Sequence, residues 1–255
     1  MLTNSQIKHI LSLRQKKFRV QHQQFIVEGV KVVKELLASE YKTVTVYCVE
    51  DVVEELRGIA SSMAGTGNVE VISEIQLQKI SNLETPNKVL AIASIPQAEL
   101  NSAELQGQLS LAVDTINDPG NLGTIIRTAA WFGIRTIICS EHTADAWNPK
   151  TVQAAMGALF RTNVVYADLK KVVEDLKSNN VPVYATTLVG ADIYKAELSA
   201  TGLIVIGSES HGVSKELLSI IDKKLLIPSF GGRVAESLNA AVAAGIVCGE
   251  FRRRL

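Results

Sequence analysis

Hydrophobic residues recur along the first part of the chain with two alternating periods, which predicts an α/β unit over residues 1–96. Val30, Val33 and Leu37 share one face of a helix that begins near Glu28. The elements that follow are a strand at 43–49, a helix at 52–63, a strand at 69–72, a short helix at 75–81 and a strand at 89–93. This is about the size of one folding unit.

A second alternating series occupies residues 109–255, after a polar stretch at 97–108 that indicates a linker. Its predicted elements are strands at 109–113, 136–139, 163–166, 181–185, 203–206 and 224–227, with helices at 122–132 and 168–178 among those between them. Strands that are apolar on both faces indicate a buried, mainly parallel sheet. The last helix, from about Val234, is apolar nearly all round, so it packs either between subunits or within one subunit.

The composition limits the location and the kind of site. Cys48, Cys139 and Cys248 are too far apart for a zinc site and are expected to be buried thiols in a reducing compartment. No signal peptide is evident, and the longest apolar stretch, 240–248, is too short to span a membrane. We therefore expect a soluble, cytoplasmic protein with no bound metal.

Charge is unevenly distributed although the net charge is +0. No Asp or Glu precedes Glu28, whereas five cations do: Lys8, Arg14, Lys16, Lys17 and Arg19. Such a local basic patch attracts a phosphate backbone whatever the total charge. We expect Lys16, Lys17 and Arg19 to contact a nucleic-acid phosphate backbone; a solvated terminal helix is the alternative.

Three loops follow predicted strands at the edge where open α/β sheets bind their ligands. The first, 114–127, leads into a helix whose N-terminal N–H groups can bind an anion. Arg127 lies in that helix among apolar residues, so we expect it to need a partner, either a ligand or a nearby acid.

The second loop, 207–214, is not a Walker A loop, because Val213 and Ser214 follow Gly212 where Lys and Ser/Thr are required. Gly207 is expected to let a ligand approach the backbone, and Glu209 to accept from a ligand hydroxyl or to anchor Arg127. Ser214 has the features of an ordinary helix start, and His211, without a second histidine at ligand spacing, is interpreted as a surface residue.

The third loop, 227–241, ends its strand at Pro228, because proline cannot continue the ladder of a central strand. Ser237 and Asn239 follow near the start of an otherwise apolar helix. Capping of that helix explains one of these two polar residues but not both.

Taken in order, these loops resemble the three motifs of the SpoU/TrmH family of RNA 2′-O-methyltransferases, in the SPOUT superfamily. The motifs are Asn121-Leu-Gly-Thr-Ile-Ile-Arg127, Ile206-Gly-Ser-Glu209-Ser-His-Gly212, and Ile227-Pro228 followed by Ser237-Leu-Asn239. A further match lies at 157–161, and 25–29 is similar to the ribosomal-protein-like substrate domain that many members carry.

The resemblance implies a parallel sheet whose C-terminal segment is threaded into a deep trefoil knot, and a homodimer formed through the C-terminal domain. It implies that S-adenosylmethionine is the cofactor and that RNA is the substrate, with rRNA favoured over tRNA. The implied cofactor-binding residues are Thr186, Gly207, Ile227 and Leu238. The residues implied around the methyl group and the target ribose are Asn121, Arg127, Glu209, Ser237 and Asn239.

The chain departs from the family pattern in three places, and two other functions stay open. Ser229 replaces a frequent Met, the 231–235 stretch is longer than usual, and Ala240-Ala241 replaces a frequent Val-Ser. A Rossmann-type oxidoreductase or methyltransferase is disfavoured because the first loop lacks GxGxxG. A catalytically silent RNA-binding or ribosome-assembly factor of the same fold would carry the same motifs.

Overall fold

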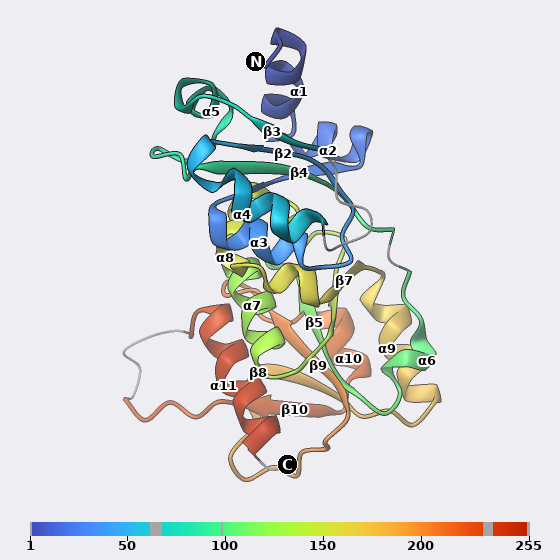
Figure 1. Ribbon diagram of the computed structural model, residues 1–255. Coiled ribbons are helices and arrows are strands. Elements are labelled where there is room, and N and C mark those ends of the chain that lie inside the picture. The colour runs from blue at the N-terminus through green and yellow to red at the C-terminus, as the bar shows by residue number, and fades with distance from the viewer. Residues whose placement is uncertain (1, 62–67, 98, 232–236, 254–255) are drawn as a thin grey trace. The chain divides into compact units, whose positions relative to one another are not determined.

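The computed structural model describes residues 2–61, 68–97, 99–231 and 237–253. The chain divides into two compact units, of which unit 1 comprises 1–97 and 145–161, and unit 2 comprises 98–144 and 162–255. Figure 1 shows the elements of both units. The mixed α/β class and the mainly parallel second sheet that the hydrophobic pattern predicts are both confirmed.

Unit 1 contains a four-stranded mixed sheet in the order β1-β4-β2-β3. Its strands are β1 (Gln24–Glu28), β2 (Thr43–Cys48), β3 (Asn68–Val71) and β4 (Val89–Ser94). Its helices are α1 (Asn4–Ser12), α2 (Lys16–His22), α3 (Val30–Leu37), α4 (Glu50–Ser61), α5 (Glu74–Ile80), α8 (Pro149–Ala155) and the 3₁₀ helix η1 (Ala158–Arg161).

The start of α3 differs from the prediction. Glu28 is the last residue of β1, and Gly29, with φ of 96°, makes the turn into a helix that begins at Val30. Strand β1 pairs antiparallel with β4, and its Phe25, Ile26 and Val27 are buried. This run was not predicted as a strand, because a buried strand this short has no alternation of polar residues to reveal it.

The 145–161 segment lies in unit 1, although the residues before and after it in the chain belong to unit 2. Tyr41 contacts the ring of Phe160 edge-on at 5.3 Å and donates to the Leu159 carbonyl. Gly157, with φ of 89°, leaves no room for a side chain, because an added Cβ would lie 2.8 Å from Cβ of Glu35. The 145–161 segment is therefore packed against α3 and the residues that follow this helix.

Unit 2 contains a six-stranded parallel sheet in the order β10-β8-β9-β5-β6-β7. Its strands are β5 (Leu109–Asp114), β6 (Thr136–Cys139), β7 (Asn163–Tyr166), β8 (Val183–Asp192), β9 (Gly202–Gly207) and β10 (Lys223–Leu226). Its helices are α6 (Ser102–Leu105), α7 (Pro119–Trp131), α9 (Leu169–Ser178), α10 (Lys215–Ile220) and α11 (Ala240–Arg253).

Helices cover both faces of the unit 2 sheet, which accounts for its almost uninterrupted burial. Val183 and Ala185 of β8 belong to the core that α6, α9 and α10 cover. Tyr184, between them, contacts Phe251 of α11 on the opposite face at 5.0 Å. Helices α7 and α11 pack together, as Figure 1 shows.

Helix α11 begins later than predicted. Residues 237–239 precede it without helical structure, and 232–236, which include most of the longer 231–235 loop, lie outside the described residues. The helix buries Ala244, Val247 and Phe251 within its own unit, whereas Val242 is 51% exposed. Within this chain the helix is thus covered on most sides but not on all.

Candidate functional site

Asn121 is held at the start of α7 by local capping. The Asp118 side chain accepts a hydrogen bond from the Asn121 backbone N–H at 2.9 Å, and Pro119 begins the helix with its fixed φ. These two residues explain why the chain turns into a helix directly after the loop that follows β5. The Asn121 side-chain amide remains available for contacts with other loops.

Glu209 stands in a tight loop at the carboxyl end of β9. Ser208 forms an isolated β-bridge with Gly212, and the Gly212 N–H donates to the Ser208 carbonyl at 2.8 Å. A Cβ on Gly207 would lie 2.0 Å from the Gly212 carbonyl carbon. The loop itself therefore gives a reason for this glycine: the returning backbone fills the space that a side chain would take.

Asn239 caps α11 and reaches the first loop. Its Oδ1 accepts from the Ala241 and Val242 N–H groups at 3.0 and 3.3 Å. Its Nδ2 donates to Oδ1 of Asn121 at 3.0 Å. The side-chain carbonyl oxygen of Asn239 therefore caps the helix, and its amide nitrogen makes the contact with Asn121.

These three side chains form one hydrogen-bonded group, which we call the amide–carboxylate cluster (Asn121, Glu209 and Asn239). Glu209 Oε1 accepts from Asn121 Nδ2 at 2.5 Å, from Asn239 Nδ2 at 3.3 Å and from the Ala240 backbone N–H at 3.2 Å. The carboxylate thus lies at the N-terminus of α11, where the helix dipole favours negative charge. The fold brings together one residue from each of the three predicted motifs.

Ser237 joins the same region, because its Oγ donates to the Glu209 backbone carbonyl at 3.4 Å. This bond ties the residues that precede α11 to the loop after β9. The second polar residue near the α11 start, which capping left unexplained, is therefore a link between two motif loops.

Arg127 differs from the expectation. It is exposed on α7, and no described acid forms an ion pair with it. Glu209 accepts from amides and does not anchor the guanidinium. The apolar neighbours in sequence, Ile125 and Ile126, face the core while Arg127 points outward, as helical geometry requires of residues one or two positions apart.

The four predicted cofactor-binding residues lie on or after three adjacent strands. Thr186 directly follows the stretch of β8 that pairs with β9, and its hydroxyl donates to the Val205 carbonyl at 3.2 Å. Gly207 ends β9, and the half-buried Ile227 follows β10. Leu238, next to Asn239, is 44% exposed.

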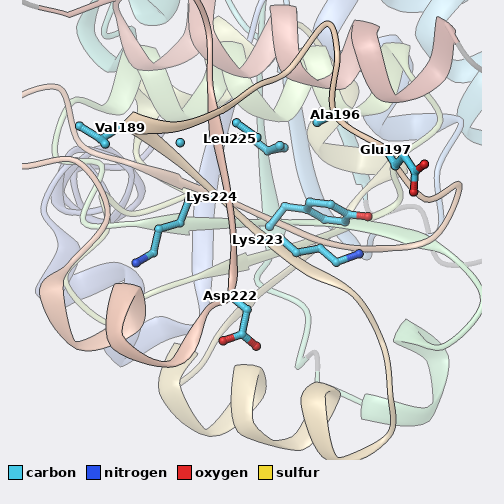
Figure 2. Close-up of a pocket in the computed structure, with 10 residues that line it drawn as sticks. Val189, Ala196, Glu197, Asp222, Lys223, Lys224 and Leu225 are labelled. Atoms are coloured by element: carbon cyan, nitrogen blue, oxygen red, sulfur yellow. The ribbon is translucent and has the colours of Figure 1, made fainter.

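A separate hollow of about 640 Å³ lies at the β8–β10 edge of the sheet and is shown in Figure 2. It is lined by residues such as Tyr184, Lys223 and Lys224, and none of the predicted site residues belongs to it. Lys223 and Lys224 point in opposite directions, so they do not converge on one ligand. Polar side chains converge instead at the amide–carboxylate cluster.

The three residues expected to contact RNA have different environments. Lys16 and Lys17 are exposed on α2. Arg19 is only 1% exposed and donates through Nε and Nη2 to Asp145 Oδ2, at 2.9 and 2.5 Å. The prediction that Arg19 contacts RNA phosphates was therefore wrong, because its guanidinium is already used inside the protein.

Several predictions of absence or burial can be compared with the structure. All three cysteines are free and buried, and His211 is exposed and hydrogen-bonded to Ser210. The described ranges hold no group of His, Cys, Asp and Glu side chains that could bind a metal. Within the same ranges, no helix has the length and apolar character that crossing a bilayer requires.

One buried acid at this edge was missed. Asp114, the last residue of β5, accepts from the Ser214 N–H at 2.8 Å. The available signal was a carboxylate at the end of an otherwise apolar strand, which must find donors if it is buried.

Comparisons with known proteins agree with this geometry. Residues 108–249 match the SpoU rRNA Methylase family, and residues 4–91 match the MRM3-like substrate binding domain. The chain is 34% identical, over 98% of its length and 96% of the relative, to 23S rRNA (guanosine(2553)-2′-O)-methyltransferase RlmP of Bacillus subtilis.

Solved structures show the same similarity over the whole chain. A TrmH-family protein from Porphyromonas gingivalis aligns with a TM-score of 0.90 and 36% identity, covering 100% of both chains. An AdoMet-bound rRNA methyltransferase from Sinorhizobium meliloti aligns with a TM-score of 0.87 and 32% identity, covering 100% of this chain and 97% of that one. The amide–carboxylate cluster and these matches lead to one conclusion: the chain belongs to the SpoU rRNA methylase family.

Proposed function

We propose that this chain transfers a methyl group from S-adenosylmethionine to a ribose 2′-hydroxyl of ribosomal RNA. The observation that carries the proposal is the amide–carboxylate cluster, which joins all three motif loops at the carboxyl edge of a parallel sheet. The similarity to an rRNA 2′-O-methyltransferase of Bacillus and to an AdoMet-bound rRNA methyltransferase of Sinorhizobium supports the substrate and the cofactor. The intact cluster gives no support to a catalytically silent binding factor.

The residues near the strand ends fit this cofactor chemically. Ile227 and Leu238 offer apolar surface for an adenine ring, and Thr186 offers a hydroxyl oxygen. The Glu209 carboxylate provides negative charge that suits a sulfonium cation. S-adenosylmethionine, when bound, supplies the electrophilic methyl group. Gly207 would contact the cofactor through its backbone.

Arg127 would act on the RNA. Its exposed guanidinium is available to clamp a phosphate next to the target ribose and to stabilise the negative charge that develops on the 2′-oxygen. It is a poor general base, because a guanidinium keeps its proton at any physiological pH. Asn121, Asn239 and Ser237 would hold the motif loops and the ribose in register, since orientation supplies much of the rate of such a transfer.

Variants of Arg127 test this role. We expect Arg127→Ala to lower the single-turnover rate of methyl transfer to unmodified rRNA by about 10²–10³-fold, the usual cost of losing one charge-stabilising donor. Arg127→Lys should recover only part of that rate, because an ammonium cannot bind phosphate in a bidentate manner. If both variants keep near-native rates with saturating cofactor and RNA, the assignment fails.

Unit 1 would hold the RNA. Lys16 and Lys17 lie exposed on α2, and no acid precedes Glu28 in the sequence. Arg19 is excluded from these contacts and instead fixes the α1–α2 turn, since its Nη1 donates to the Leu13 and Arg14 carbonyls, each at 2.8 Å. The substrate-binding part would comprise 1–96 and the catalytic part 109–255, with 97–108 as a linker.

The assembly would be a homodimer through the C-terminal domain. Trp131 at the end of α7 is 85% exposed, and Val242 on the neighbouring α11 is 51% exposed. Because α7 and α11 pack together, these exposed side chains lie on one helix pair, which a second copy would cover. The C-terminal segment would be threaded as a deep trefoil knot, as in the family. A cytoplasmic location suits an rRNA substrate and three buried, free thiols.

A further inference from the structure

Asp114 is a buried acid that the proposed reaction does not use. It is 5% exposed at the carboxyl end of β5, opposite Gly207 of β9. No described cation forms an ion pair with it. A buried carboxylate without a counter-ion is costly and persists only where hydrogen bonds compensate for the lost water. Packing alone therefore does not explain why a carboxylate is buried at this position.

Each carboxylate oxygen of Asp114 holds a different motif loop. Oδ2 accepts from the Ser214 backbone N–H at 2.8 Å, where the loop that carries Glu209 ends and α10 begins. The Ser214 side chain makes no capping bond of its own. The bond from Asp114 thus fixes one end of the Glu209 loop, whose other end is fixed by the pairing of β9 with β5.

Oδ1 of Asp114 accepts from the Thr115 hydroxyl at 3.0 Å. Thr115 has φ of 59°, a left-handed conformation that is unfavourable for a β-branched residue and persists only when its surroundings impose it. Its N–H donates to Ser140 Oγ at 2.9 Å. These two bonds hold the strained turn from which the chain runs to Asp118 and Asn121.

We propose that Asp114 is a positioning residue that sets the contact between Asn121 and Glu209. One carboxylate fixes the two loops that carry these side chains, and the bond between Asn121 and Glu209 forms only when both loops are in place. The proposal rests on the proposed methyl transfer. It predicts that Asp114 acts on the rate only through the amide–carboxylate cluster and not through RNA binding.

A double-mutant cycle of Asp114→Ala and Asn121→Ala tests it in methyl-transfer assays. Asp114→Ala alone should lower kcat about 10- to 100-fold, as expected for misplacement by about 1 Å, with the KM for RNA unchanged. In the Asn121→Ala background, the same change should have almost no further effect, because residues that act as a unit are not additive. Fully multiplicative effects would overturn the proposal.

Two further variants separate positioning from charge and from loss of stability. Asp114→Asn should retain most of the rate, because its amide can accept from Ser214 and donate to the Thr115 hydroxyl. Asp168→Ala removes a carboxylate that caps α9 in the same unit, and it should leave kcat unchanged. An inactive Asp114→Asn variant would contradict a positioning role. So would a loss of kcat in Asp168→Ala equal to that in Asp114→Ala.

Amide NMR keeps the test independent of turnover. The side-chain NH₂ resonances of Asn121 and Asn239 should shift in Asp114→Ala and stay near their wild-type positions in Asp114→Asn. If the wild type transfers no methyl group but these shifts occur, the proposed function fails while the positioning role stands. Unchanged resonances in Asp114→Ala would refute the positioning role itself.

Discussion

Replacement of Arg19 by alanine should destabilise the protein far more than replacement of its exposed lysine neighbours. The substitution removes four donated bonds, two to Asp145 and one each to the Leu13 and Arg14 carbonyls. It leaves the Asp145 carboxylate, with a side chain 11% exposed, without its cation. The Trp147 backbone N–H, which donates to Asp145 Oδ1 at 3.0 Å, is retained but carries no net charge.

The magnitude follows from burial. Removal of one partner of a buried ion pair costs about 3–5 kcal/mol, because the remaining charge stays desolvated. A typical domain is stable by about 5–15 kcal/mol, so Arg19→Ala is expected to remove a large fraction of the stability of unit 1. Lys16→Ala changes an exposed side chain with no such role and should alter the free energy of unfolding by less than about 0.5 kcal/mol.

Urea unfolding followed by circular dichroism measures both variants, and filter binding at several salt concentrations measures their RNA affinity. The Arg19→Ala/Asp145→Ala double variant should be more stable than Arg19→Ala, because no unpaired buried charge remains. If Arg19→Ala has wild-type stability but reduced RNA affinity, the guanidinium contacts RNA and our interpretation of its burial is wrong.

Two other predictions concern unit 1 and the buried thiols. The Lys16→Ala/Lys17→Ala double variant should keep its fold and reduce the slope of log K against log salt by about 1 for each lysine; an unchanged slope would exclude both from phosphate contact. Burial raises the pKa of the Cys248 thiol to about 12 from 9.0 in the unfolded chain. The folded state then holds this proton between pH 9 and about 12 while the unfolded state loses it, so the stability contributed by Cys248 is complete below pH 9 and declines through that window. Urea unfolding at pH 8 and pH 10 should show a smaller decline in Cys248→Ala than in the wild type; equal declines would contradict it.

Strand positions in unit 2 were predictable because each strand is a short apolar run bounded by breakers. The strands at 136–139 and 163–166 match the predicted limits. Strand β8 was predicted to end at residue 185 but extends to Asp192. After a register shift at Lys224/Leu225, β8 pairs again with β10. This second stretch of pairing depends more on the partner strand than on the local sequence.

The candidate site was predictable as a set of residues but not as a set of contacts. Motif order identified Asn121, Glu209 and Asn239, and the structure joins them by hydrogen bonds. Arg127 was expected to need a partner because of its apolar neighbours, whereas helix rotation turns it outward. Position in sequence shows which residues share a loop, but the direction of a side chain depends on the helix phase.

Arg19 shows that the sequence also does not reveal which charged side chains are paired inside the fold. Its basic neighbours suggested a surface patch, but its partner, Asp145, is 126 residues away in the chain. No local pattern reveals a pairing at that distance. A sequence can therefore indicate a basic segment without showing which of its cations is used inside the fold.

The most direct test of the central claim is to identify the methylated product. Purified protein is incubated with methyl-labelled S-adenosylmethionine and unmodified rRNA, which is then digested to nucleosides and analysed by mass spectrometry. Arg127→Ala serves as the matched control, because its exposed side chain makes no described contact on which the fold depends. The account predicts a labelled 2′-O-methylnucleoside with the wild type and little with the variant. Label on a base, or no label in any rRNA, would contradict it.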